Sequence, residues 1–130
     1  MKISFAYGLV FLCFVYVGCV VRSDETEKIN ISGRIYQIGN DSTLGGIHVE
    51  VGYYSECIIC DYGETIFIEG ASTLTDSNGY YKINLSIYGR DTNEDWFIKV
   101  YDDKFDPKYQ AQTDLIGFGK TYKEFHLQKL

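Results

Sequence analysis

The sequence is poor in the side chains that build metal centres, because it holds only two histidines and four cysteines among 130 residues. His48 and His126 are not in a zinc-ligand spacing, so we expect each to be a solvated residue on an outward strand face. Cys13 and Cys19 belong to an N-terminal apolar segment, which leaves one C-x-x-C pair where a four-cysteine zinc site needs two. We therefore predict no zinc site and no cofactor.

Basic residues are also in the minority. The chain has 12 Lys and Arg against 18 Asp and Glu, and a formal net charge of −6. An acidic surface repels phosphate backbones, whereas nucleic-acid binding generally requires a basic patch. We therefore expect no nucleic-acid partner.

One long apolar run is present, and it lies at the N-terminus. Lys2 precedes the run from Ile3 to Val17, and Gly18, Cys19 and a polar stretch follow it. This arrangement is typical of a secretory signal. The run is shorter than the ~20 apolar residues that span a bilayer, so a lasting membrane helix is disfavoured. We expect residues 1–18 to be a signal peptide.

The expected cleavage site resembles a bacterial lipobox. In that motif a small residue, here Gly18, precedes a cysteine that is acylated and becomes the first residue of the mature protein. Tyr16 departs from the pattern, which usually has Leu there. The resemblance implies lipidation of Cys19, an acidic tether over residues 19–27, and a cell-envelope location at the outer membrane or cell surface. The alternative is cleavage after Ser23, which would give a freely secreted protein.

The remainder of the chain, residues 28–130, has the period-two alternation of β-strands and is long enough for one domain. Twelve Tyr and eight Phe with a single Pro also favour strands. About seven strands are predicted in two packed antiparallel sheets. They cover residues 29–36, 47–52 and 66–68, the two arms of a hairpin within 72–87, and residues 96–101 and 121–128.

The hairpin has the clearest turn signal, Thr75-Asp76-Ser77-Asn78-Gly79. Asp76 can accept hydrogen bonds from the backbone amides that follow it, and Asn78 and Gly79 tolerate left-handed conformations. Beyond the turn, one strand face is expected to point inward. Its residues are Tyr81, Ile83, Leu85 and Ile87.

Four motifs together resemble the carboxypeptidase regulatory-like domains, which belong with the transthyretin-like and Cna-B-like sandwiches. They are Gly33-Arg34-Ile35, the glycine-led segment 45–51, the Thr-Asp-x-x-Gly-x-Tyr turn at 75–81, and Ile98-Lys99-Val100. The resemblance covers nearly all of residues 28–130. It implies an all-β fold, a seven-stranded antiparallel Greek-key sandwich of the transthyretin-like (prealbumin-like) type. It also implies a non-catalytic module, although a fold does not by itself determine a function.

Cys57 and Cys60 form a C-x-x-C pair in a loop or at a strand edge. A thioredoxin-type pair sits at a helix N-terminus, where the thiol pKa is lowered, and no such helix is predicted here. In an oxidising compartment the two thiols are expected to close a small loop. We interpret the pair as a structural disulfide.

The segment Asp91 to Asp95 superficially resembles the start of a calcium loop. Asp91, Asn93 and Asp95 are weak candidates for cation ligands, because Trp96 stands where the calcium loop requires Gly. We favour a solvated acidic loop and expect no metal there.

No Ser-His-acid motif, phosphate-binding glycine loop or defined carboxylate pair is recognisable, so we expect no enzymatic activity. We expect a lipid-anchored binding or structural module with a protein or glycan partner. A freely secreted transthyretin-like ligand-binding or adhesion protein is the alternative. Outward aromatic residues are the candidates for contact with a partner. They are Tyr36, Tyr53, Tyr54, Tyr80 and Phe97.

Overall fold

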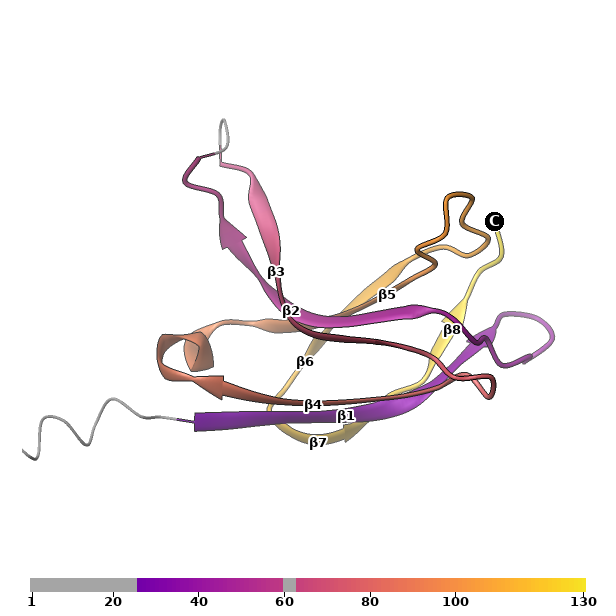
Figure 1. Ribbon diagram of the computed structural model, residues 1–130, viewed down its shortest axis with the longest axis horizontal. Helices are drawn as coiled ribbons and strands as arrows, with labels where there is room; N and C mark the ends of the chain where they lie inside the picture. The colour runs from indigo at the N-terminus through magenta and orange to yellow at the C-terminus, as the bar shows by residue number, and fades with distance from the viewer. Residues whose placement is uncertain (1–25, 60–62) are drawn as a thin grey trace, which may run out of the picture.

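The computed structural model describes residues 26–59 and 63–130, and it is built almost entirely of strands (Figure 1). A short 3-10 helix, η2 (Gly89–Asn93), is inserted between two of them. No helix in these two segments is long and apolar enough to cross a membrane. The strands are β1 (Thr26–Gln37), β2 (His48–Glu56), β3 (Thr65–Leu74), β4 (Tyr80–Tyr88), β5 (Trp96–Tyr101), β6 (Gln112–Ile116), β7 (Gly119–Tyr122) and β8 (Phe125–Leu127).

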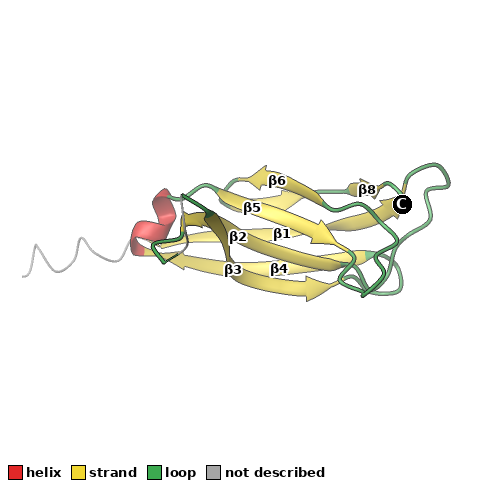
Figure 2. Ribbon diagram, turned by 90° about the horizontal axis from the view of Figure 1, so that it is seen from above, coloured by secondary structure: helices red, strands yellow, loops and turns green. Residues whose placement is uncertain are grey.

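The strands form two packed sheets, which confirms the predicted all-β sandwich. The first, here called the β1 sheet, has the order β4-β1-β7, and β8 also pairs with β1. The second, the β2 sheet, has the order β3-β2-β5-β6. Figure 2 shows the two layers from above, with the strands running along the long axis of the molecule.

The core lies between the sheets and follows the predicted alternation. Along the central strands, alternate side chains are buried between the sheets, and most of those between them lie on the outer surface of the sandwich. Tyr81 and Phe125 are the largest side chains that are fully buried. The inward face predicted for β4 is confirmed, because Tyr81, Ile83 and Ile87 are buried and Leu85 packs partly buried against them. The other strands contribute alternate residues to the same core, from β1 (Ile29, Ile31, Ile35), β2 (Val49, Val51), β5 (Trp96, Ile98, Val100) and β8 (Phe125, Leu127).

The turn at 75–79 is present, but the expected hairpin is wrong in one respect. β3 pairs with β2 and β4 pairs with β1, so the turn carries the chain from one sheet to the other. Asp76 Oδ1 accepts hydrogen bonds from the amides of Asn78 and Tyr80, both at 2.9 Å, as predicted. Strands of one sheet and strands that face each other across the core show the same alternation, because both bury one face.

Buried Thr75 fixes this crossover. Its hydroxyl donates a hydrogen bond to the carbonyl of Leu44 at 2.7 Å and accepts one from the amide of Ile47 at 2.9 Å. The Thr75 amide also donates to the Ile47 carbonyl at 2.9 Å. The loop before β2 is therefore held to the end of β3 by the side chain and backbone of one residue, because its buried backbone groups need partners.

The last predicted strand is divided and runs parallel to the first. β7 pairs with Ile29 to Ser32 of β1, and β8 pairs with Ile35 to Gln37, both in parallel register. The division lies opposite Gly33, where the backbone at Lys123 lies directly against β1. A Cβ atom at Gly33 would overlap the carbonyl oxygen of Lys123. The expected seven antiparallel strands are thus eight within the described residues, two of them parallel to β1.

Two further strands differ from the sequence-based expectation. β3 covers ten residues as one strand, where a short strand at 66–68 and a separate hairpin arm were predicted. The prediction divided this strand because a bulge opposite Val51 and Gly52 interrupts its alternation. β6 was not predicted at all. It is an edge strand in which only Ile116 is buried, so it has little apolar signal.

Replacing Gly33 by Ala should be strongly destabilising. The added methyl group meets backbone rather than a flexible side-chain end, so β1 and the backbone at Lys123 must move apart. We expect a loss of about 1–3 kcal/mol or more in the free energy of unfolding, measured by denaturant titration. Gly117→Ala is the control, since no described atom beyond its chain neighbours lies within 4 Å of its Cβ position. Equal midpoints for the two variants would contradict this packing.

Alkaline pH should destabilise the fold through Tyr81. Burial raises the pKa of the Tyr81 phenol above its usual value of 10, and the neighbouring Tyr122 adds to the effect. Its hydroxyl donates to the Lys123 carbonyl at 2.7 Å. Above pH 10 the unfolded chain loses the phenol proton while the folded state still keeps it. The contribution of Tyr81 to the free energy of unfolding is therefore complete below pH 10 and falls as the pH rises further. Unfolding midpoints should decline above that pH, and less steeply in Tyr81→Phe than in the exposed Tyr80→Phe.

Candidate functional site

The side of the β2 sheet that faces away from the core carries a group of aromatic and titratable side chains, here called the outer face. Alternation on β2 points His48, Glu50 and Tyr54 outward, because Val49 and Val51 point into the core. β5 lies antiparallel beside β2, so its outward residues fall into register with these. The outer face comprises His48, Glu50, Tyr54, Phe67, Glu69, Phe97, Lys99 and Tyr101.

The aromatic part of the outer face is centred on Tyr54. Its ring meets those of Phe67 and Phe97 edge to face, with centroids 5.2 Å apart in both pairs. Gly52 provides the room, because a Cβ atom there would lie 2.7 Å from Phe67 Cζ. Tyr54 is 40% exposed. The cluster therefore offers apolar area to a partner while its members fix each other's orientation.

The polar part lies next to it on the same strands. His48 Nε2 is 3.2 Å from Glu50 Oε1, and His48 Nδ1 is 3.7 Å from Asp103 Oδ2. The Tyr101 hydroxyl donates a hydrogen bond of 2.6 Å to Glu50 Oε1, and the Tyr101 ring lies 4.9 Å from the His48 ring. One ligand atom each from His48, Glu50 and Glu69 lies within 4.8 Å of the other two. These three residues could hold a metal ion.

The negative charges of this group act on Tyr101. Burial and the hydrogen bond to Glu50 raise the pKa of Tyr101 to about 12, and the charges of Glu50, Asp103 and Glu69 contribute in the same direction. Lys99 Nζ lies 5.2 Å from the centroid of the Tyr101 ring and 5.7 Å from that of Phe67. Lys99 thus joins the aromatic and polar parts of the outer face through cation–π contacts.

The expectation that His48 is merely solvated is wrong. Its side chain is 21% exposed, and its Nε2 atom is buried without a hydrogen bond among the described residues. His126 does lie exposed, stacked on Tyr36 with centroids 5.1 Å apart. The alternation of His48 and Glu50 was visible in the sequence. The pairing of β2 with β5 that brings Tyr101 to them was not.

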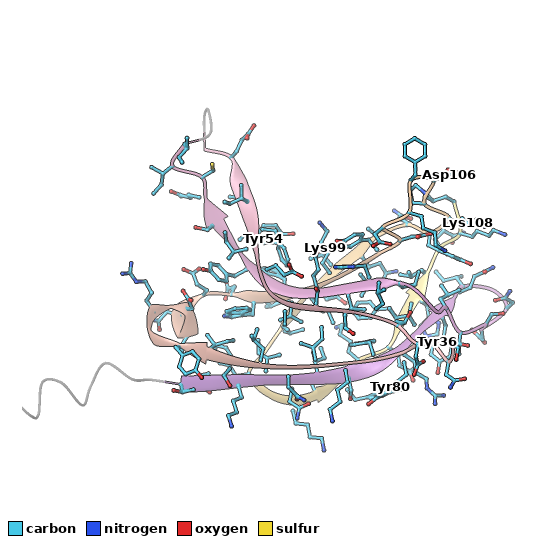
Figure 3. All side chains as sticks on the ribbon, in the orientation of Figure 1. Tyr36, Tyr54, Tyr80, Lys99, Asp106 and Lys108 are labelled. Atoms are coloured by element: carbon cyan, nitrogen blue, oxygen red, sulfur yellow. The ribbon has the colours of Figure 1, made fainter. Side chains whose placement is uncertain are left out.

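The five aromatic residues predicted as contacts do not share one surface. Tyr54 and Phe97 lie together on the outer face, where Phe67 joins them. The prediction that Tyr53 faces outward is wrong, because its side chain packs against Trp96 and the core, at a centroid distance of 5.1 Å. Tyr36 and Tyr80 belong to β1 and β4 in the opposite sheet, and Figure 3 shows both on the far side of the sandwich from Tyr54. Whether any of them binds a partner stays a prediction.

The cysteine and lipidation predictions fall partly outside the described residues. Cys57 is disulfide-bonded. Cys60 and Cys19 both lie outside the described residues, so the pairing of Cys57 with Cys60 and the acylation of Cys19 stay predictions.

The weak cation candidates are in and beside η2. Asp91 and Asn93 belong to the 3-10 helix and Asp95 follows it. The Asp91 carbonyl accepts a hydrogen bond of 2.9 Å from the Trp96 indole, which ties this loop to the core. Across residues 26–59 and 63–130, the group of three His, Cys, Asp or Glu side chains close enough to share an ion is instead His48, Glu50 and Glu69.

Comparison of the sequence with known proteins identifies no relative. No protein-family model matches the chain, and no curated protein matches it.

Solved structures do resemble the fold. A 3-chlorocatechol 1,2-dioxygenase from Rhodococcus opacus superposes with a TM-score of 0.51 at 10% identity, over 84% of this chain and 62% of the dioxygenase. The chain thus spans less than two thirds of that enzyme, and the likeness shows the fold alone. The C-terminal domain of the shaft pilin SpaA from Lactobacillus rhamnosus GG gives a TM-score of 0.48 at 7% identity, over 82% of this chain and 99% of that domain. A streptococcal ancillary pilin gives a TM-score of 0.45 at 12% identity, over 80% of this chain and 33% of the pilin. Both pilin scores are too low to support a statement about this chain.

The aromatic cluster should be measurable as energetic coupling. In a double-mutant cycle on the free energy of unfolding, Tyr54→Ala and Phe97→Ala should be coupled by about 0.5–1.5 kcal/mol, because their rings are in edge-to-face contact. Tyr54→Ala combined with Tyr80→Ala is the control pair, since these residues lie in opposite sheets. Its effects should add. Additive effects for Tyr54 and Phe97 as well would show that the cluster does not form in solution.

Proposed function

We propose that this protein is a non-catalytic surface lipoprotein, a binding or structural module held at the cell envelope by lipid on Cys19. The observation that carries the proposal is the sequence around Cys19, where a short apolar segment ends in Gly-Cys and changes at once to polar residues. Acyl chains on such a cysteine anchor a protein by burying methylene groups, at ~0.8 kcal/mol each, without a spanning segment.

The geometry of the domain is compatible with a short tether. β1 begins at Thr26, seven residues after Cys19. A chain of that length reaches at most roughly 25 Å when fully extended. The end of the sandwich at which β1 begins would therefore stand close to the bilayer. The opposite end, with the turn at 75–79 and the loop after β5, would point away from it (Figure 1).

The outer face supports the binding role. It presents Tyr54 and its aromatic neighbours beside carboxylates and Lys99, which is the mixture of apolar area and polar groups that glycan and protein contacts use. In Figure 1 the β2–β3 arms and the loop after β5 rise at opposite ends of this sheet. A partner that contacts the outer face would thus approach along the flank of the tethered domain.

Mutation of Cys19 tests the anchor. In a bacterial host, Cys19→Ser should abolish acylation and move the protein from the membrane fraction to the soluble fraction. Intact-mass spectrometry of the mature N-terminus and fractionation provide the two measurements. The expected wild-type product begins at an acylated Cys19.

Cys13→Ser is the matched control, because Cys13 lies inside the expected signal peptide and should be absent from the mature chain. It should leave acylation and fractionation unchanged. A wild-type product that begins at Asp24 without lipid would overturn the anchor and favour the freely secreted transthyretin-like alternative.

A further inference from the structure

The polar part of the outer face has the donor atoms of a metal site that the sequence did not indicate. We propose that His48, Glu50 and Glu69 bind one divalent ion of the zinc class, through His48 Nε2 and one oxygen of each carboxylate. The proposal does not depend on whether Cys19 is acylated, since all three ligands lie on β2 and β3 of the folded domain.

The strongest observation is the state of His48 Nε2. This atom is buried and has no hydrogen-bond partner among the described residues. It lies 3.2 Å from Glu50 Oε1, but the two atoms are not aligned for a hydrogen bond. A buried nitrogen without a partner is costly, and a metal ion placed between nitrogen and carboxylate would satisfy it.

The carboxylates provide the charge that a cation requires. A carboxylate oxygen of Glu50 lies within 4.8 Å of one of Glu69. Asp103 lies on the other side of the His48 imidazole, near Nδ1. Close carboxylates repel one another, so a divalent ion between Glu50 and Glu69 would remove an unfavourable interaction as well as form new bonds.

The present separations require only a small closure. The three ligand atoms lie within 4.8 Å of one another. In a tetrahedral zinc site, with bonds of about 2.0–2.2 Å, ligand atoms are separated by roughly 3.4 Å. Glu69 is exposed, so its carboxylate can move inward by rotation about its side-chain bonds. The fourth position would be open to water or to a donor from a partner.

The surrounding groups resemble the outer contacts of metal sites. Asp103 Oδ2 faces His48 Nδ1 at 3.7 Å, which suits a carboxylate that orients a metal-binding imidazole. The Tyr101 hydroxyl holds Glu50 Oε1 at 2.6 Å, and the Tyr101 ring packs on His48. Asp103 and Tyr101 are therefore positioning residues for two of the three ligands.

The donor set selects the class of ion. Calcium and magnesium prefer sites made of oxygen alone, whereas imidazole nitrogen combined with carboxylate suits zinc and its neighbours in the first transition row. The site should therefore prefer Zn²⁺ to Ca²⁺ and Mg²⁺. Cobalt in the same position would report the ligand geometry through its visible absorption.

The test is calorimetric titration of the chelator-treated, untagged protein with ZnCl₂. We expect one Zn²⁺ per chain, no comparable binding of CaCl₂ or MgCl₂, and a higher thermal midpoint with Zn²⁺, because a ligand bound only to the folded state stabilises it. His48→Gln and Glu69→Gln should each weaken binding by more than about tenfold. Asp103→Asn should lower the Zn²⁺ affinity about tenfold, because the His48 imidazole would lose the carboxylate that orients it.

Two controls keep the result interpretable. His126→Gln removes the other histidine and should bind Zn²⁺ like the wild type. Glu69 is exposed and its replacement should not disturb folding, so weaker binding in Glu69→Gln cannot be attributed to misfolding. Circular dichroism of each variant verifies the fold. Absence of a saturable Zn²⁺ site in the wild type, or unchanged affinity in both His48→Gln and Glu69→Gln, would overturn the proposal.

Discussion

The close approach of two backbone segments at Gly33 is the constraint on which the β1 sheet depends. The backbone of Lys123 lies against β1 where residue 33 has no side chain. Its amide donates a hydrogen bond to the Ser32 carbonyl at 2.8 Å, and its carbonyl accepts one from the buried Tyr81 hydroxyl. This contact lies between β7 and β8, where the last segment is divided into two strands. It also joins β1, β4 and the C-terminal segment at one point, because each contributes a backbone or side-chain group to it.

Much of this architecture could be predicted from local sequence, because burial on one face imposes a period of two. Tyr81, Ile83 and Ile87 were assigned correctly to the core for that reason. The same pattern does not say which strand lies beside which. Strands that share a sheet and strands that face each other across the core alternate alike, so the 75–79 turn was taken for a hairpin. The edge strand β6 escaped prediction because Ile116 is its sole buried residue.

The outer face shows the same division between local and long-range information. Tyr54 and Phe97 were recognised as outward aromatics, but Phe67 entered the group only through strand pairing. The setting of His48 was missed because Tyr101 and Asp103 are more than fifty residues away in sequence. Titratable clusters on sheets are built by register between distant strands. A single sequence shows their members, but it does not show which of them meet.

The parallel pairing of β1 with β7 and β8 has a mechanical consequence. The start of β1 and the end of β8 lie toward opposite ends of the sandwich, although the strands are neighbours (Figure 1). A pulling force applied between the start of β1 and the end of β8 would act along the strands. The hydrogen bonds on this edge of β1 would then carry the load together in shear, instead of opening one after another as in a zipper.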